Sequence, residues 1–207
     1  ADQAAPEGRG LALFVVGVVV ATVVACAGAL RQSPAQLMQP KAPKAGARIL
    51  LDGSTVGSAV RMMDNAIDVS RFPLDAQAQE ARAKRRTPLG VTGLADALIL
   101  CKTRYGSAQS LELTRTWLAA VSHAAYRASV ELAREKAPFP LYDMNPYLSR
   151  PHIKALPPDI YNGIAAHGIR NALLTSIAPT GTISLFADNV SSGIEPVFAF
   201  NYTRKVL

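Results

Sequence analysis

The stretch Asn171–Ser184, N-A-L-L-T-S-I-A-P-T-G-T-I-S, predicts a buried strand that turns sharply and opens a helix. The expected strand is apolar, through Leu173, Leu174, Ile177 and Ala178. Pro179–Gly181 has turn composition, and Thr182 can begin the helix. Such a junction gathers backbone N–H groups and the positive end of a helix dipole at one point, which suits a phosphate.

Within this junction, Gly181 lets the backbone come close to a ligand. The hydroxyls of Thr180, Thr182 and Ser184 can add hydrogen-bond donors. Taken by itself, the stretch fits an ordinary strand-to-helix turn with a Thr or Ser cap slightly better than a phosphate site. The other runs of the sequence decide between these interpretations.

Composition describes a folded chain with few charges. The 207 residues are 49% hydrophobic and 18% charged, which excludes a disordered protein. The net charge is +7, and the densest basic run is Arg82, Lys84, Arg85 and Arg86. Because no aromatic residue interrupts this run, a solvated helix face is favoured over nucleic-acid binding. The sequence has no starting Met and stops at Leu207 within an expected strand, so we expect a piece of a longer protein.

Cysteine and histidine usage excludes two kinds of site. Cys26 and Cys101 are far apart and form no C-x-x-C pattern, so neither a disulfide framework nor a zinc site is expected. The three histidines share no metal-ligand spacing. This usage fits a reducing compartment and therefore a cytoplasmic protein.

Residues 1–59 stand apart from the rest of the chain. Residues 11–30 carry no charge and are long enough for a transmembrane helix. The same residues fit a buried Val- and Ala-rich segment, or sequence translated outside the native reading frame. Residues 31–48 have linker composition. We leave 1–59 unassigned and place the domain boundary near Val60.

From Thr55 onward, apolar spacing and capping residues predict several helices, over 55–68, 75–86, 94–100, 107–136 and 157–167. Ser107 caps the longest one, and Cys101 is expected to be buried. The apolar stripe of the long helix is Leu111, Trp117, Leu118, Val121, Ala125, Ala128 and Leu132. Three prolines keep 138–151 irregular, and alternating aromatics predict a strand over 197–203. Helices alternating with strands indicate an α/β domain.

Four runs are similar to one known family in their order and spacing: 61–68, 84–96, 176–184 and 192–198. They resemble the large catalytic subunit of ribonucleotide reductase, and more narrowly its adenosylcobalamin-dependent (class II, vitamin B12-dependent) form. The resemblance covers about residues 60–207. It implies the C-terminal part of a ten-stranded α/β barrel, here a helix-rich fragment.

The resemblance also implies a function, the reduction of ribonucleotides to 2′-deoxyribonucleotides for DNA synthesis. Cobalamin homolysis makes a thiyl radical on a finger-loop cysteine, and two further cysteines supply electrons. The implied partners are a ribonucleotide, with a diphosphate favoured, and an external thiol reductant such as thioredoxin. The residues implied to hold the substrate's phosphates are Pro179, Thr180, Gly181, Thr182, Ile183 and Ser184.

The sequence departs from the family where the radical chemistry belongs. The N-x-C-x-E run expected shortly before Val60 is missing, and neither Cys26 nor Cys101 lies in the context of a catalytic thiol. We therefore assign phosphate binding only, name no catalytic or metal-binding residue, and expect the fragment alone to be inactive. The alternative is a membrane-anchored interaction or structural protein that uses residues 11–30. A basic nucleic-acid binder is a weaker third option.

Overall fold

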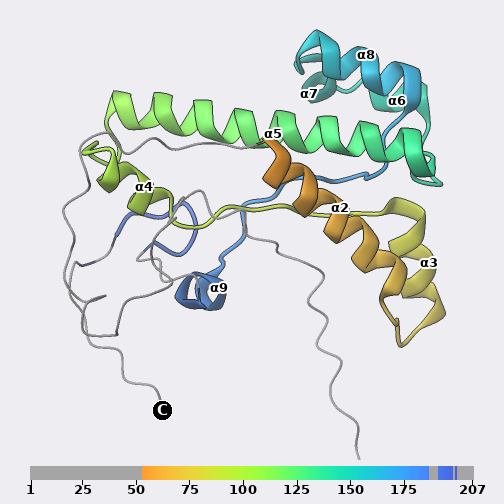
Figure 1. Ribbon diagram of the computed structural model, residues 1–207, viewed down its shortest axis with the longest axis horizontal. Coiled ribbons are helices and arrows are strands. Elements are labelled where there is room, and N and C mark those ends of the chain that lie inside the picture. Colours follow the sequence, from red (N-terminus) through yellow and green to blue (C-terminus); the bar gives the residue numbers. More distant parts are fainter. Residues whose placement is uncertain (1–52, 187–190, 198, 200–207) are drawn as a thin grey trace, which may run out of the picture.

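The computed structural model describes residues 53–186, 191–197 and 199. Within them the chain is helix-rich (Figure 1). The helices are α2 (Gly53–Val69), α3 (Asp75–Lys84), α4 (Leu94–Leu100), α5 (Ala108–Lys136), α6 (Met144–Leu148), α7 (Pro151–Lys154), α8 (Pro158–His167) and α9 (Gly181–Phe186). The described residues form no named strand, and Leu89 and Thr175 make an isolated parallel bridge.

The long helix α5 organises the described part of the chain. Its first turn is capped by Ser107, whose side chain accepts a hydrogen bond from the Ser110 N–H at 3.2 Å. Helices α2 and α8 both pack against α5, as Figure 1 shows. The core between these elements is apolar and includes Val60, Met63, Val121, Ala125, Leu132, Ile160 and Ile164.

The predicted helices are confirmed with small changes at their ends. The prediction for 138–151 was partly wrong, because α6 forms within it. Asp143 caps α6, and Pro146 occupies its first turn, where a missing N–H costs no helical hydrogen bond. Leu111 is 60% exposed and does not belong to the apolar stripe of α5. Cys101 is only half-buried, because it follows the last residue of α4.

The predicted buried strand at 173–178 is extended but only partly buried. It runs parallel to residues 87–89: Thr87 N–H donates to Leu173 O at 2.9 Å, and Leu89 N–H donates to Leu174 O at 2.8 Å. Leu174 is buried, whereas Leu173 and Ile177 are 44% and 65% exposed. Strands of an α/β barrel are covered on both faces and have neighbours on both sides. The described residues supply one neighbour, so the barrel itself is not visible.

Some sequence-based predictions fall outside the described residues. These include the apolar stretch 11–30 and most of the expected strand at 197–203. None of the helices described here combines the length and the apolar character that crossing a membrane requires.

Candidate functional site

The turn before α9 is built around Thr180. This residue has φ 45°, in the left-handed region, and its carbonyl accepts the Ser184 N–H at 2.8 Å. Helix α9 therefore begins at Gly181, one residue earlier than predicted. The left-handed residue of this turn is Thr180, so what Gly181 contributes is space.

The open side of this turn consists of backbone. Helix geometry leaves the N–H groups of Gly181, Thr182 and Ile183 without an intrahelical acceptor. Gly181 and Thr182 are exposed, and a Cβ placed on Gly181 would meet no atom within 4 Å. An anion can therefore approach these N–H groups directly, on the positive side of the helix dipole.

Two of the hydroxyls expected to bind phosphate make hydrogen bonds within the turn and its supporting loop. Thr180 Oγ1 donates to Ser192 O at 2.5 Å. Ser184 Oγ donates to Gly181 O at 2.8 Å, and Ser184 is 2% exposed. Each hydroxyl has one proton to donate, and in this structure both protons are used in hydrogen bonds to backbone carbonyls. The donors open to a ligand are the N–H groups and the exposed Thr182.

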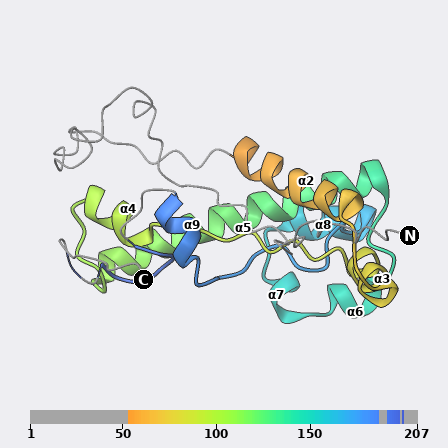
Figure 2. The ribbon, with the colours of Figure 1, turned by 90° about the horizontal axis from the view of Figure 1, so that it is seen from below.

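The loop 191–195 joins this turn to the start of α4. Leu94 N–H donates to Gly193 O at 3.0 Å, and Gly93 N–H donates to Ser191 O at 3.2 Å. In return, Ser191 N–H donates to Asp96 Oδ2 at 2.8 Å. Figures 1 and 2 show α4 and α9 at the same end of the molecule. Three of the four family-like runs, at 84–96, 176–184 and 192–198, therefore meet at the candidate site.

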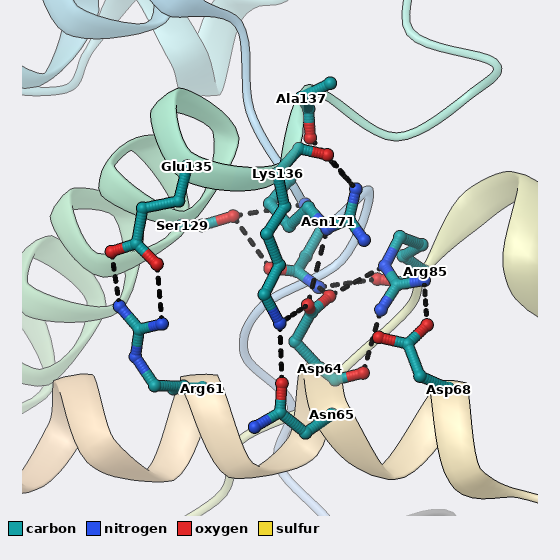
Figure 3. A network of polar contacts seen from close by, with 11 residues as sticks. Arg61, Asp64, Asn65, Asp68, Arg85, Ser129, Glu135, Lys136, Ala137 and Asn171 are labelled. Carbon is teal, nitrogen blue, oxygen red and sulfur yellow. Dashed lines mark hydrogen bonds and ion pairs between the residues drawn. The ribbon is translucent and has the colours of Figure 1, made fainter.

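The remaining run, 61–68, takes part in a second cluster around a buried carboxylate (Figure 3). Asp64 is 0% exposed, and its Oδ1 accepts from Arg85 Nε at 2.7 Å and from Asn171 Nδ2 at 3.0 Å. Arg170 Nε donates to the other oxygen at 3.3 Å. Ser129 Oγ donates to Asn171 Oδ1 at 2.9 Å, which ties α5 to the same cluster.

This cluster corrects the interpretation of the basic run. Arg85 is 4% exposed, and it also donates to Asp68 Oδ1 at 2.8 Å, so it is a buried partner and not part of a solvated face. Burial alone would raise the pKa of the Asp64 carboxyl. The hydrogen bond and charge of Arg85, together with the charge of Arg170, outweigh burial and hold that pKa below its ordinary value.

The turn before α9 could be predicted from the sequence, but the loop that supports it could not. The pair Asp96 and Ser191 is separated by 95 positions, and no local pattern connects them. The burial of the Asp64 carboxylate was likewise not predicted, because Asp64 lies within an ordinary helical pattern. The signal in the sequence was indirect: Asp64 shares a helical face with Val60, Met63 and Ile67, and a charge buried on such a face needs a partner.

Two mainly apolar cavities lie in the described part of the chain, one near the turn and one away from it. A cavity of about 370 Å³ lies beside the segment that leads into the turn, between Leu89, Val91, Leu118 and Ile177. Another, of about 260 Å³, lies between α2 and α3 and is apolar, with Met63, Ile67 and Phe72 in its wall. In the part of the chain that the structure describes, no three His, Cys, Asp or Glu residues gather in a way that could hold a metal ion.

Comparison with protein families gives one match that spans most of the chain. The model described as "Ribonucleotide reductase, barrel domain" matches residues 49–207. We expected the domain to begin near Val60, and the match begins 11 residues before it. The match includes all four family-like runs, the turn before α9 and the cluster around Asp64.

Curated relatives agree with this match. The vitamin B12-dependent ribonucleoside-diphosphate reductase of Mycobacterium tuberculosis is 37% identical over 170 residues, which are 78% of this chain and 22% of the relative. The protein of the same name from Thermoplasma acidophilum is 35% identical, over 74% of this chain and 18% of the relative. The ribonucleoside-diphosphate reductase large subunit of Caenorhabditis elegans is 32% identical, over 71% and 20%. The chain thus spans about a fifth of the length of these relatives.

Proposed function

This chain belongs to the ribonucleotide reductase family, and we propose that it is part of a catalytic subunit that reduces ribonucleoside diphosphates to 2′-deoxyribonucleotides. The observation that carries the proposal is the meeting of three family-like runs at the open start of α9. Residues far apart in sequence hold this turn, and its backbone donors stay exposed. A local cap would have been enough to satisfy the start of an ordinary helix. That arrangement supports a ligand site over an ordinary strand-to-helix turn.

The role proposed for this turn is to hold the phosphates of the substrate. The N–H groups of Gly181, Thr182 and Ile183 donate to phosphate oxygens, and the exposed Thr182 hydroxyl can add a donor. Thr180 and Ser184 hold the turn in shape through their carbonyl contacts. Pro179 leads the chain into the turn and completes the proposed site.

The radical step needs residues beyond those described. Cys101, the free cysteine of the described part, directly follows α4 at the opposite end from Gly93, about 12 Å along the helix axis. It is half-buried and lies away from the contacts that form the turn. We therefore propose that the turn binds substrate, while the thiyl cysteine and the reducing thiols belong to other parts of the enzyme. The isolated chain is expected to be inactive.

For the cofactor, the proposal is adenosylcobalamin, which when bound supplies the radical that starts the reaction. Its support is that the Mycobacterium and Thermoplasma relatives are named vitamin B12-dependent. The Caenorhabditis relative does not carry those words in its name. The corrin ring of cobalamin itself holds the cobalt, so the proposal names no metal-ligating residue of this chain. The thiol reductant, such as thioredoxin, and a cytoplasmic location are parts of the same proposal.

The test is a titration of the isotope-labelled full chain with ADP, followed by the amide signals in NMR spectra. Binding at the turn shifts the amides of Gly181, Thr182 and Ile183 and leaves those of α8 unchanged. Adenosine serves as the matched control, because it lacks the phosphates and is expected to shift none of the three. If several millimolar ADP leaves these amides in place, the phosphate-binding role is wrong.

A further inference from the structure

We propose that Glu195 is a positioning residue for the phosphate turn, acting through the N–H of Gly193 and the carbonyl of Ser192. The proposal rests on the function proposed above, since it concerns how the same turn is held. Glu195 Oε2 accepts the Gly193 N–H at 2.6 Å, within a tight loop of the chain. Ser191 Oγ donates to Glu195 O at 2.6 Å and closes the loop from its other side.

Gly193 lies between this carboxylate and the phosphate turn. A Cβ placed on Gly193 would be 3.3 Å from Glu195 Oε2 and 3.2 Å from Thr180 Oγ1. The same Cβ would be 3.2 Å from the carbonyl oxygen of Ala178. Glu195 and the turn therefore both lie close to the same glycine, so a shift of the Glu195 side chain can displace the turn through Gly193.

The turn needs such support because Thr180 is strained. A β-branched residue at φ 45° is costly and persists only where its surroundings fix it. The contact that fixes it is the hydrogen bond from Thr180 Oγ1 to Ser192 O, and Ser192 is the residue just before Gly193. The loop is anchored further by Tyr105, whose hydroxyl donates to Ile194 O at 2.6 Å.

The Glu195 carboxylate lies in the loop beside the proposed phosphate site, where its negative charge is electrostatically unfavourable. A structural role would explain why a carboxylate occurs at this position. Like charges repel, and removing the charge of Glu195 by itself should help a phosphate to bind. The hydrogen bond to Gly193 offers the reason, because a carboxylate is a strong acceptor for a backbone N–H. The two effects can be separated: Glu195→Gln keeps an acceptor oxygen and removes the charge, whereas Glu195→Ala removes both.

The first measurement needs no ligand. In the full chain, Glu195→Ala should speed the hydrogen exchange of the Gly193 amide about tenfold and shift the Thr180 and Gly181 amide signals. Glu195→Gln should restore the exchange rate to near that of the unmodified chain. Glu112→Ala, which removes an exposed carboxylate paired with Arg115 on α5, is the matched control and should change neither.

The second measurement is ADP affinity. Glu195→Ala should weaken binding about three- to tenfold, and Glu195→Gln should bind as tightly as the unmodified chain or slightly more tightly. Unchanged exchange and affinity in Glu195→Ala would overturn the proposal. The proposal would also be overturned if Glu195→Gln had the same exchange rate and ADP affinity as Glu195→Ala. That result would mean that the charge of Glu195 matters and not its acceptor oxygen. Failure of the unmodified chain to bind ADP would refute the phosphate site alone, since the exchange rates still decide the role of Glu195.

Discussion

The Asp64 carboxylate and the Arg85 guanidinium lie 2.7 Å apart, although 21 positions separate the two residues in the sequence. Their side chains are 0% and 5% exposed. Arg85 also donates from Nη2 to the Asp64 carbonyl at 2.8 Å, so one guanidinium binds both the side chain and the backbone of Asp64 in α2. A second hydrogen bond, from Asn171 Nδ2 to Arg85 O at 3.1 Å, connects the pair to the segment that leads into the turn before α9.

Removing the carboxylate should destabilise the fold strongly. Asp64→Ala leaves the buried Arg85 charge without its main partner, and breaking one side of a buried pair costs about 3–5 kcal/mol of unfolding free energy. Urea denaturation followed by circular dichroism measures the change. Arg115→Ala is the matched control, because the pair of Arg115 with Glu112 is exposed and should contribute less than about 1 kcal/mol. Equal losses in the two variants would contradict the importance of the buried pair.

The same pair should make stability depend on pH. Because the folded-state pKa of Asp64 is lowered, its ionised form contributes stability that is complete above the ordinary value of about 3.9 and is lost as pH falls through the folded-state pKa. The unmodified chain should therefore lose more unfolding free energy between pH 5 and pH 3 than Asp64→Asn loses. Urea titrations at a series of pH values test this, and parallel curves for the two proteins would contradict it.

The helices could be predicted from the sequence because their signals are local. Ser107 caps α5 where the pattern placed it, and Pro158 begins α8 in agreement with the Pro-Pro signal. The extended segment at 173–178 could not be predicted to the same extent. Its burial depends on neighbouring strands, and Ile177 is exposed because the described residues supply no cover for it.

The position of the turn in the candidate site could be predicted from the sequence, but the contacts that hold it could not. The turn at 179–184 was visible as a pattern of Pro, Gly and hydroxyl residues. Which atoms face outward depends on Ser192, a residue 12 positions from Thr180, and no periodicity relates the two. The left-handed conformation of Thr180 was likewise unexpected, because a glycine follows it and would adopt that conformation at lower cost.

A third prediction compares two glycines that both have positive φ. Gly168 and Gly106 have φ 71° and 79°, so alanine is strained at both positions by about 1 kcal/mol or more, and the ψ of −163° places Gly168 in a region essentially restricted to glycine. At Gly168 a Cβ would also overlap the Pro138 side chain and lie 3.2 Å from Tyr142 Cε1, whereas at Gly106 it would meet no atom within 4 Å. Gly168→Ala should therefore lower the unfolding free energy by at least 1 kcal/mol more than Gly106→Ala. Equal effects in thermal denaturation would contradict this contact.

The last prediction separates stability from ligand binding at the turn. Gly181 has ample room for a Cβ and is the first residue of α9, where alanine is a good helix former. Gly181→Ala should therefore leave the unfolding free energy unchanged to within about 0.5 kcal/mol, or raise it slightly. The added methyl group occupies space that a phosphate needs in order to approach the N–H groups, so ADP affinity should fall about tenfold.

Gly193→Ala is the matched comparison for Gly181→Ala, because a Cβ there would press on the Ala178 carbonyl and on Thr180 Oγ1, both at 3.2 Å. It should lower stability by about 1–3 kcal/mol as well as weaken binding. Thermal denaturation and ADP titration of both variants give the four values required. An intact affinity in a stable Gly181→Ala protein would contradict the phosphate site, since the open face of Gly181 would then have no ligand to admit.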